Sequence, residues 1–589
     1  MNAVLLVIVT FFGYLVAYHT YGKWLARKIF AISDVHRMPS EEFRDGVDFV
    51  PTKKSIVFGH HFTTVAGLGP IVGPALGIIW GWLPALIWIF FGAIFMGAVH
   101  DFSTLVISAR HGGRTIGDLT NNIIGPGAMY SFQLIMQLLL FIVLSVFALI
   151  IATLFMLYPQ AVLPIWLQIP IAMWLGHQVE RGKNEIISSI IALVLLYGTI
   201  LLGVYFPVDL MKLGFIQGMA AQGSNPADLV TVIWCILLFI YVFIASTMPV
   251  QRLLQPRDFI NSNQLLVALI LLVTGIILAH PVITAPAINP KAFAEGNDVP
   301  NIMPILFIII ACGAISGFHS IASSGTTVKQ VKRESDTLFI GYGAMLLEGF
   351  LAMLVLVAIA AGLGLGFEQN GILYTGREAF DHYYSSWSAA NSGIGAKLES
   401  FITGAANLLN YLGIPVKIGR PMIAVFIVSF ANTTLDSATR MQRLSLQEIF
   451  RNRKNGKVRK PVNNRYVATV FVVMLAATMT FLKPGGKGAL FLWPLFGSLN
   501  QLLAALGLAV VSVYLYKKRN KYLLAAVPML FVLVMTVWSM IENIGEFFLK
   551  KDYILTTLSI IILILTLWLL VAGVQSVIKT FRVNRRVSE

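Results

Sequence analysis

Cysteine is almost absent from this sequence. The 589 residues include only two, Cys235 and Cys312, and both lie in apolar stretches. A disulfide framework and a cysteine-based metal centre are therefore excluded. Charge is also scarce, because 12% of the residues are charged and 57% are hydrophobic. No soluble core absorbs so many apolar side chains, so the composition predicts an integral membrane protein.

Acidic residues are fewer than basic ones, 27 against 43, and the net charge is +16. The basic residues gather in short segments between apolar runs, which is the pattern that orients spans in a membrane. Nucleic-acid binding is therefore not predicted. Residues 2–18 are apolar but lack a charged leading region and a small-residue cleavage site, so we expect a retained helix and not a signal peptide.

Apolar runs long enough to cross a bilayer set the predicted architecture. Fifteen candidates are found, of which 161–176 is short and holds Pro164 and Pro170. An N-terminus outside and a C-terminus inside would put about three quarters of the lysines and arginines on the inner side. The candidate spans are 2–18, 56–80, 83–109, 128–157, 161–176, 185–206, 229–249, 264–280, 301–325, 338–366, 417–436, 466–482, 488–515, 522–542 and 553–577. The segment 367–416 is expected on the outer side, with 395–412 as a surface helix or lid.

The second span is interrupted by residues that break helices. It contains two histidines, five glycines, Pro70 and Pro74. Proline lacks a backbone donor and clashes with the preceding turn, so a continuous helix is not expected. Backbone groups freed inside hydrocarbon must be satisfied by protein or by a water-filled cavity, so a broken helix predicts a ligand path beside it. The alternative is a kinked helix whose glycines allow close packing.

A related pattern occurs in the ninth span. Gly59, His61 and Gly67 match Gly317, His319 and Gly325 at identical spacing. The two spans run in opposite directions in the predicted topology. Paired, oppositely directed interruptions indicate the binding site of an inverted-repeat secondary transporter.

Asp101, Glu348 and Asp436 stand out among the carboxylates of the predicted spans. A charge at bilayer depth costs at least ~2.5 kcal/mol, so such a residue faces a partner or a cavity. The alternative for each is a structural carboxylate bound to backbone amides. The membrane histidines, His60, His61, His100 and His319, have no zinc-ligand spacing, so no metal site is predicted. They are instead expected to donate to substrate or to relay protons. The alternative for each is a structural histidine whose hydrogen bonds are satisfied within the protein.

The eleventh span ends in a run of hydroxyl side chains that includes Thr433 and Thr434. These hydroxyls either bond back to their own helix or bind a coupling cation together with carbonyls of a broken helix.

The motifs of the chain resemble those of the carbon starvation protein A family of bacterial transporters, regarded as uptake systems for pyruvate or peptides. The motifs are FGHHFTTVAGLGPIVGP at 58–74, GAVHDF at 97–102, QPRDF at 255–259, ACGAISGFH at 311–319, SSGTT at 323–327, FIGYGAMLLE at 339–348, LDSATR at 435–440 and WPLFGSLNQ at 493–501. The resemblance covers most of the chain. It implies a fold like that of the amino acid–polyamine–organocation superfamily, with two extra helices between the broken ones.

We therefore predict an all-α polytopic membrane protein of about fifteen helices, with an inverted-repeat core at 55–450, a first helix and basic loop at 1–54 and further helices at 451–589. It is expected to be a transporter of the bacterial cytoplasmic membrane and not an enzyme, to need no cofactor, and to couple import to H⁺ or Na⁺. Pyruvate is the first candidate substrate and a short peptide is the alternative. The alternatives from other functional classes are an intramembrane metalloprotein that uses the histidines and a nutrient sensor. The sequence does not give the oligomeric state.

The predicted site falls into two sets. The substrate-binding residues are His60, His61, Thr63, Thr64, Gly67, Gly69, Gly317, His319, Ser323, Ser324, Gly325 and Thr326. The coupling residues are Asp101, His100, Glu348, Thr433, Thr434 and Asp436.

Overall fold

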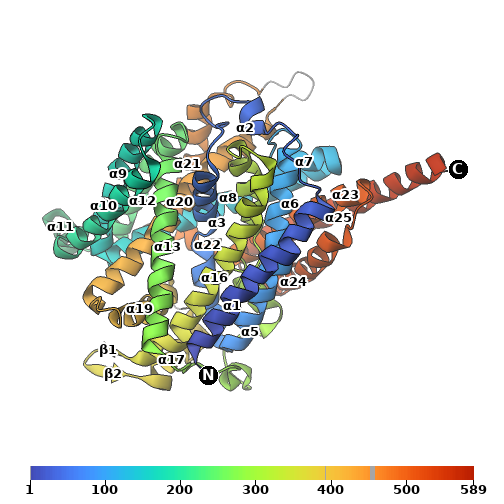
Figure 1. The fold of residues 1–589 in the computed structure, drawn as a ribbon. Coiled ribbons are helices and arrows are strands. Elements are labelled where there is room, and N and C mark those ends of the chain that lie inside the picture. Colours follow the sequence, from blue (N-terminus) through green and yellow to red (C-terminus); the bar gives the residue numbers. More distant parts are fainter. Residues whose placement is uncertain (1, 392, 452–457, 589) are drawn as a thin grey trace.

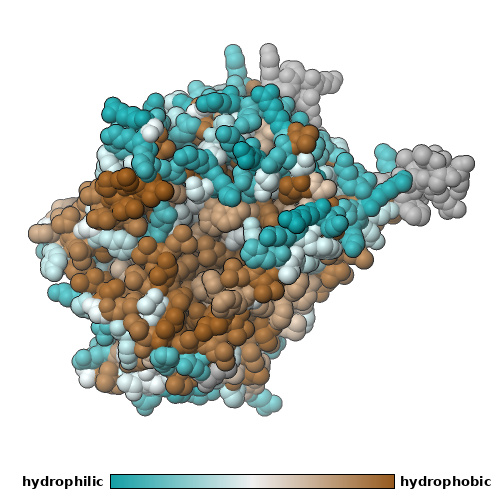
Figure 2. Space-filling view, in the orientation of Figure 1, coloured by the Kyte–Doolittle hydropathy of each residue, from teal (hydrophilic) through white to brown (hydrophobic). Residues whose placement is uncertain are grey.

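The computed structural model describes residues 2–391, 393–451 and 458–588; residues 452–457, part of the predicted basic loop 451–465, lie outside this range. Long helices run between two faces (Figure 1). The N-terminal face holds the N-terminus, the hairpin β1–β2 and α17, and the opposite basic face holds α2 and α7. Figure 2 shows a broad apolar region between hydrophilic edges, as expected for a bilayer-embedded surface.

The described chain is built almost wholly of helices. In chain order they are α1 (Ala3–Ala17), α2 (Pro39–Glu42), α3 (Lys54–Val65), α4 (Gly69–Gly77), α5 (Trp82–Gly92), α6 (Ala98–Ala109), α7 (Ile116–Ile123), α8 (Pro126–Leu157), α9 (Val162–Glu180), α10 (Glu185–Tyr205), α11 (Gly214–Ala221), α12 (Pro226–Thr247), α13 (Leu254–Ala279), α14 (Ile302–Ile309), α15 (Gly317–Gly325), α16 (Ala344–Val357), α17 (Gly376–Tyr384), α18 (Trp387–Ala390), α19 (Ile394–Asn410), α20 (Val416–Ile449), α21 (Arg465–Phe481), α22 (Gly488–Phe491), α23 (Trp493–Lys517), α24 (Leu523–Leu549) and α25 (Tyr553–Ser588). The strands β1 (Phe367–Gln369) and β2 (Ile372–Tyr374) pair antiparallel.

The predicted spans all correspond to helices. In the described part of the chain, eleven helical segments are long and apolar enough to cross a bilayer, and the bent pair α3–α4 makes a twelfth. The remaining predicted spans are α9, which contains Pro170, the interrupted pair α14–α15, and the shorter α21. The predicted all-α polytopic fold is confirmed.

The first interrupted helix consists of α3 and α4, which meet at a bend of 43°. Regular helix ends at Val65 and begins again at Gly69, with Pro70 in the first turn of α4. Proline is well suited to that position, because the missing amide would have no partner within the helix. Gly67 lies in the break, where a Cβ atom would come within 2.6 Å of the hydroxyl of Thr434.

The second interrupted helix consists of α14 and α15. Residues 310–316 between them are not regular helix, and Ser316 is extended. Both interruptions that the sequence predicts are therefore present.

The two interrupted helices lie antiparallel, side by side. At the basic face Thr52, just before α3, bridges Val331, just after α15. Near the middle, Gly73 of α4 packs against the backbone of Ile309. At the N-terminal face the indole of Trp80 donates to Pro300 O over 3.0 Å. The start of one interrupted helix thus lies beside the end of the other, as an inverted repeat requires.

The segment 367–416 lies on the N-terminal face, as expected, but its helix does not lie exposed on the surface. Leu398, Phe401 and Ile402 of α19 are fully buried. The hydroxyl of Tyr384, at the end of α17, donates to Ala75 O of α4 over 2.7 Å. The apolar face of α19 is therefore part of the core, and the segment is tied to the first interrupted helix.

The basic face is closed by a buried ion-pair network on α20. Asp48, in the loop before α3, accepts from Arg440 over 2.7 Å, and Arg443 lies 3.4 Å away. Burial opposes the ionisation of Asp48, but the positive charges of Arg440, Arg443 and Lys329 hold its pKa well below the ordinary value. A lowered pKa means that the stabilisation is complete above pH 4 and is lost only in stronger acid. The network is therefore ionised at every physiological pH.

Asp48→Asn should destabilise the protein, because it leaves two buried guanidinium groups without a carboxylate. Breaking a buried pair costs about 3 kcal/mol, which should lower the Tm in detergent by several degrees. Arg377→Gln is the control, because the Arg377–Asp381 pair is exposed and contributes little. Equal Tm values for Asp48→Asn and the wild type would show that the network does not hold this face.

Gly73→Ala should disrupt the crossing of the interrupted helices. The added Cβ would lie 2.8 Å from Ile309 O, a backbone atom that cannot move aside without shifting α14. We expect a large loss of folded protein in fluorescence size-exclusion profiles. Gly198→Ala is the matched control, because a Cβ at that helical glycine meets nothing within 4 Å. Normal yield and activity of Gly73→Ala would contradict close packing at the crossing.

Candidate functional site

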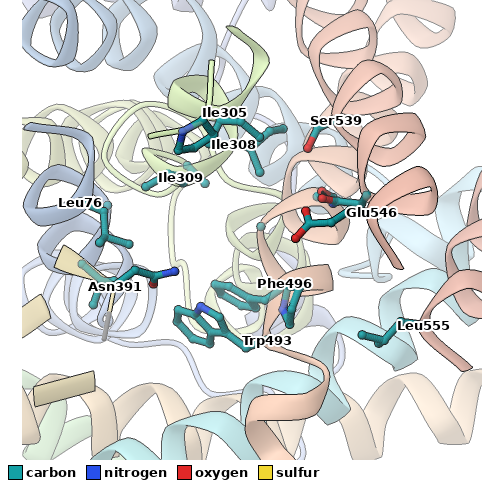
Figure 3. A pocket seen from close by; sticks show the side chains of 18 of the residues that line it. Leu76, Ile305, Ile308, Ile309, Asn391, Trp493, Phe496, Ser539, Glu546 and Leu555 are labelled. Atoms are coloured by element: carbon teal, nitrogen blue, oxygen red, sulfur yellow. Dashed lines mark hydrogen bonds between the residues drawn. The ribbon is translucent and has the colours of Figure 1, made fainter. Parts of the chain in front are cut away.

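A pocket of about 720 Å³ opens near the N-terminal face and reaches the crossing of the interrupted helices. In Figure 3, Leu76 and Asn391 lie on one side, Ser539 and Glu546 lie on the other, and Trp493 and Phe496 lie between them. The rings of Trp493 and Phe496 are stacked, with centroids 5.4 Å apart. Most of the wall is apolar, and the mouth includes Lys550 and Asp552.

The inner end of the pocket is formed by the two interruptions. Leu68 and Gly69 at the start of α4 line it, together with Ala311 and Cys312 from the non-helical stretch before α15. No side chain caps α4. Pro70 has no amide hydrogen, and the amides of Ile71 and Val72 donate to Leu68 O. The partial positive charge of the helix start and the amide of Gly69 are therefore what this end of the pocket offers to an anion.

A buried cluster lies next to Cys312; we call Asp101, His100, His319 and Glu348 the break cluster. His319 Nδ1 lies 2.8 Å from Asp101 Oδ2, and His319 Nε2 lies 3.4 Å from Glu348 Oε2. His100 Nδ1 lies 2.8 Å from the other oxygen of Asp101. All four side chains have no exposed area. Three of these residues, His100 and Asp101 on α6 and Glu348 on α16, were predicted to serve coupling, and the structure brings them together around His319 on α15.

Asp436 lies in a different cluster. Arg257 donates to its carboxylate, and the hydroxyl of Tyr241 donates to Oδ2 over 2.8 Å. Asp258 lies 3.5 Å from Arg257 Nη2 and 2.5 Å from His60 Nδ1. We call these five residues the Arg257 cluster. Arg440, one turn after Asp436 on the same helix, is not its partner: Arg440 binds Asp48, and Arg257 from the QPRDF motif binds Asp436.

Comparison with known proteins decides the family. Residues 2–539 match the family model described as carbon starvation protein CstA. The chain is 31% identical over 587 residues to the peptide transporter CstA of Campylobacter jejuni, covering 92% of this chain and 80% of that protein. It is also 31% identical over 607 residues to the pyruvate/proton symporter BtsT of Escherichia coli, covering 92% and 81%.

The chain belongs to the CstA family. The resemblance seen in the motifs is thereby confirmed, and the relatives are transporters, so the protein is a multi-pass transporter and not an enzyme. Among solved structures, the crystal structure of MhsT in complex with L-phenylalanine matches with a TM-score of 0.46 and 13% identity, over 82% of this chain and 98% of that one.

The predicted cation-binding hydroxyls of this CstA-family protein lie at the first break. Thr434 donates to Thr64 O over 3.2 Å, and Thr433 accepts from Asn261 over 2.8 Å. Thr64 and Ser437 share a hydrogen bond of 3.2 Å. The hydroxyls of α20 therefore connect to the carbonyl end of α3, as the cation hypothesis requires, and Thr434 is not bonded back to its own helix.

The predicted substrate-binding residues are dispersed, and of that set Gly69 alone lines the pocket. Thr63 and Thr326 bond back to their own helices, and Ser324 donates to Ser320 O and accepts from Ile116 N. Gly317 packs against the backbone of α23. The others are His60, His61, Thr64, Gly67, His319, Ser323 and Gly325, all buried in the walls around the breaks.

Asn500 is a site residue that the sequence reasoning did not single out. Its Oδ1 accepts from Phe318 N over 2.9 Å and from the Ser316 hydroxyl over 3.1 Å, so it caps the start of α15. An amide from α23 therefore occupies one of the two helix starts that were expected to face substrate, and α4 is left as the open one. The WPLFGSLNQ motif contained Asn500, but the motif gives no sign of this role.

Cys312, His319 and Glu348 offer donor atoms that lie within 4.8 Å of one another. The thiol contacts Ser316 at 3.5 Å, however, and carboxylates face both nitrogens of His319. That the protein needs no metal stays a prediction.

Proposed function

We propose that this protein is a cation-coupled symporter that imports a small carboxylate together with protons. The observation that supports it best is the pocket. It leads from the N-terminal face to the uncapped start of α4, and its inner end adjoins the break cluster through Cys312. A substrate anion and a proton site would then lie within a few residues of each other, which is what coupling requires.

Pyruvate is the first candidate substrate. Its carboxylate would accept from the amide of Gly69 at the positive end of α4, and its small apolar end suits the wall formed by Leu68, Val72 and Phe147. A relative is named as a pyruvate/proton symporter.

A short peptide is the second candidate. The pocket volume of about 720 Å³ exceeds what a three-carbon acid fills. On the wall opposite α4, the carboxylate of Glu546, which is paired with Lys550 in this structure, could exchange that partner for a peptide amine. Several relatives are named as peptide transporters. Uptake of labelled pyruvate and of dialanine by proteoliposomes decides between the two.

Charge balance favours the proton as the coupling ion. Asp101 and Glu348 carry two negative charges, and an imidazolium at His319 supplies one positive charge. A fully buried cluster that is one positive charge short of neutral is costly, so it takes up one more proton. Its release requires access to water on the other side, which movement of the interrupted helices would provide. Na⁺ at Thr433 and Thr434 is the alternative.

The pocket opens near the N-terminal face while Asp48 and its partners close the basic face. We infer that the N-terminal face is outside and the basic face cytoplasmic, in the bacterial cytoplasmic membrane. A channel would pass substrate without accumulation, a sensor would bind without flux, and a metalloprotein would retain metal on purification.

Asp101→Asn should lower substrate accumulation about tenfold under an inward pH gradient of one unit. The amide keeps the shape of the carboxylate but removes one negative charge, so one proton fewer accompanies each substrate, and each coupled proton contributes tenfold per pH unit. The measurement is steady-state uptake of labelled pyruvate in proteoliposomes.

Asp381→Asn serves as the control, because Asp381 lies on the exposed helix α17 far from the break cluster in the chain. Substrate exchange at equal pH should survive in Asp101→Asn, because exchange needs no net proton movement. Full accumulation in this variant would exclude Asp101 from coupling.

A further inference from the structure

The Arg257 cluster is as deeply buried as the break cluster, yet the mechanism above does not use it. It joins four helices: His60 on α3, Tyr241 on α12, Arg257 and Asp258 on α13, and Asp436 on α20. The side chains of Arg257, Asp258, Asp436 and His60 are at most 1% exposed. His60 Nε2, Asp258 Oδ1 and Asp436 Oδ1 have no hydrogen-bond partner in the described chain.

The charges of this cluster do not balance without a proton. Arg257 and Asp436 form an ion pair and cancel, while Tyr241 is a neutral donor. Asp258 is then left with one uncompensated negative charge. Arg257 Nη2 lies 3.5 Å from its carboxylate, but Arg257 already pairs with Asp436. The remaining partner is His60, whose Nδ1 lies 2.5 Å from Asp258 Oδ2. A proton held between imidazole and carboxylate makes the group neutral, as a fully buried cluster requires.

α3 contacts the surroundings of both clusters. His60 faces α13, whereas the next residue, His61, faces another element and lies 2.9 Å from Thr327 after α15. Both are on the half-helix before the first break, so a movement of α3 alters the environment of both clusters. Asn261, one turn after Arg257, donates to Thr433, which ties α13 to the hydroxyls at that break.

We propose that His60 and Asp258 form a second proton site, so that each substrate molecule is carried with two protons. The inference rests on the proposed symport function and adds the stoichiometry to it. For a monoanion such as pyruvate, two protons move one net positive charge inward. Uptake then responds to the membrane potential, by about 50-fold per 100 mV. With one proton the cycle would be electroneutral and insensitive to potential.

The test counts protons directly. Wild-type protein, Asp258→Asn and Tyr241→Phe are reconstituted in proteoliposomes with an entrapped pH dye and labelled pyruvate, or with dialanine if pyruvate is not taken up. The potential is clamped at zero with valinomycin. We expect about two protons per substrate for the wild type and about one for Asp258→Asn. Tyr241→Phe is the matched control from the same cluster, and its count should stay at two because no charge changes.

A second readout uses pyruvate at equal pH with 100 mV, inside negative. The wild type should accumulate it and Asp258→Asn should not. Asp258→Asn leaves Arg257 and Asp436 as a neutral pair, so folding is expected. The double variant His60→Gln, Asp258→Asn removes the same negative charge and repeats the test if the yield of Asp258→Asn is low.

A count of one in the wild type, or of two in Asp258→Asn, would overturn the second site alone. Failure of wild-type protein to take up either substrate under a pH gradient would instead overturn the proposed function, and this inference with it.

Discussion

Hydrocarbon offers no hydrogen bonds, and the whole core of this protein follows from that constraint. Two helices are interrupted in mid-span, at residues 66–68 and 310–316, and each interruption frees backbone groups. The two interrupted helices pack against each other and against α20 and α23, and these neighbours supply hydrogen-bond partners for the freed backbone groups. Thr434 donates to Thr64 O at the first break, and Asn500 accepts from Phe318 N at the second. What these helices do not satisfy, chiefly the start of α4, faces the pocket.

The same constraint explains the buried charges. Each cluster contains two carboxylates, with Arg257 as the permanent cation of one, and in both a histidine lies against a carboxylate. A medium that penalises net charge favours such a cluster when it holds a proton, which is the basis of the coupling that we propose. The proposal links proton binding to movement of α3, because His60 and His61 lie on the half-helix that ends at the first break.

The two faces differ in that buried ion pairs close the basic face, whereas a pocket opens near the N-terminal face. At the basic face a loop carboxylate, Asp48, meets Arg440 and Arg443 from α20, while at the N-terminal face the pocket passes between α4, α14 and α23. This is the arrangement of a carrier that is open on one side. The relatives in the CstA family are named for peptides and for pyruvate, and both classes of molecule carry a carboxylate.

The sequence by itself determined the membrane class, the positions of the spans, both interruptions and the family. These properties depend on local composition: apolar run length, proline and glycine within a run, and motif order. It also singled out Asp101, Glu348 and His319 as candidate site residues, because a charge or histidine inside an apolar span stands out without any knowledge of its neighbours.

Only the tertiary structure decided which of these residues meet. Asp436 is paired with Arg257, 179 residues earlier in the chain, and not with Arg440 one turn away. Asn500 caps a helix from another span, and most of the predicted substrate-binding residues face helix neighbours instead of the pocket. Long side chains and helix ends bind whichever group lies within reach across the bundle. Which groups lie within reach depends on how the helices pack, and no local pattern in the sequence determines that packing.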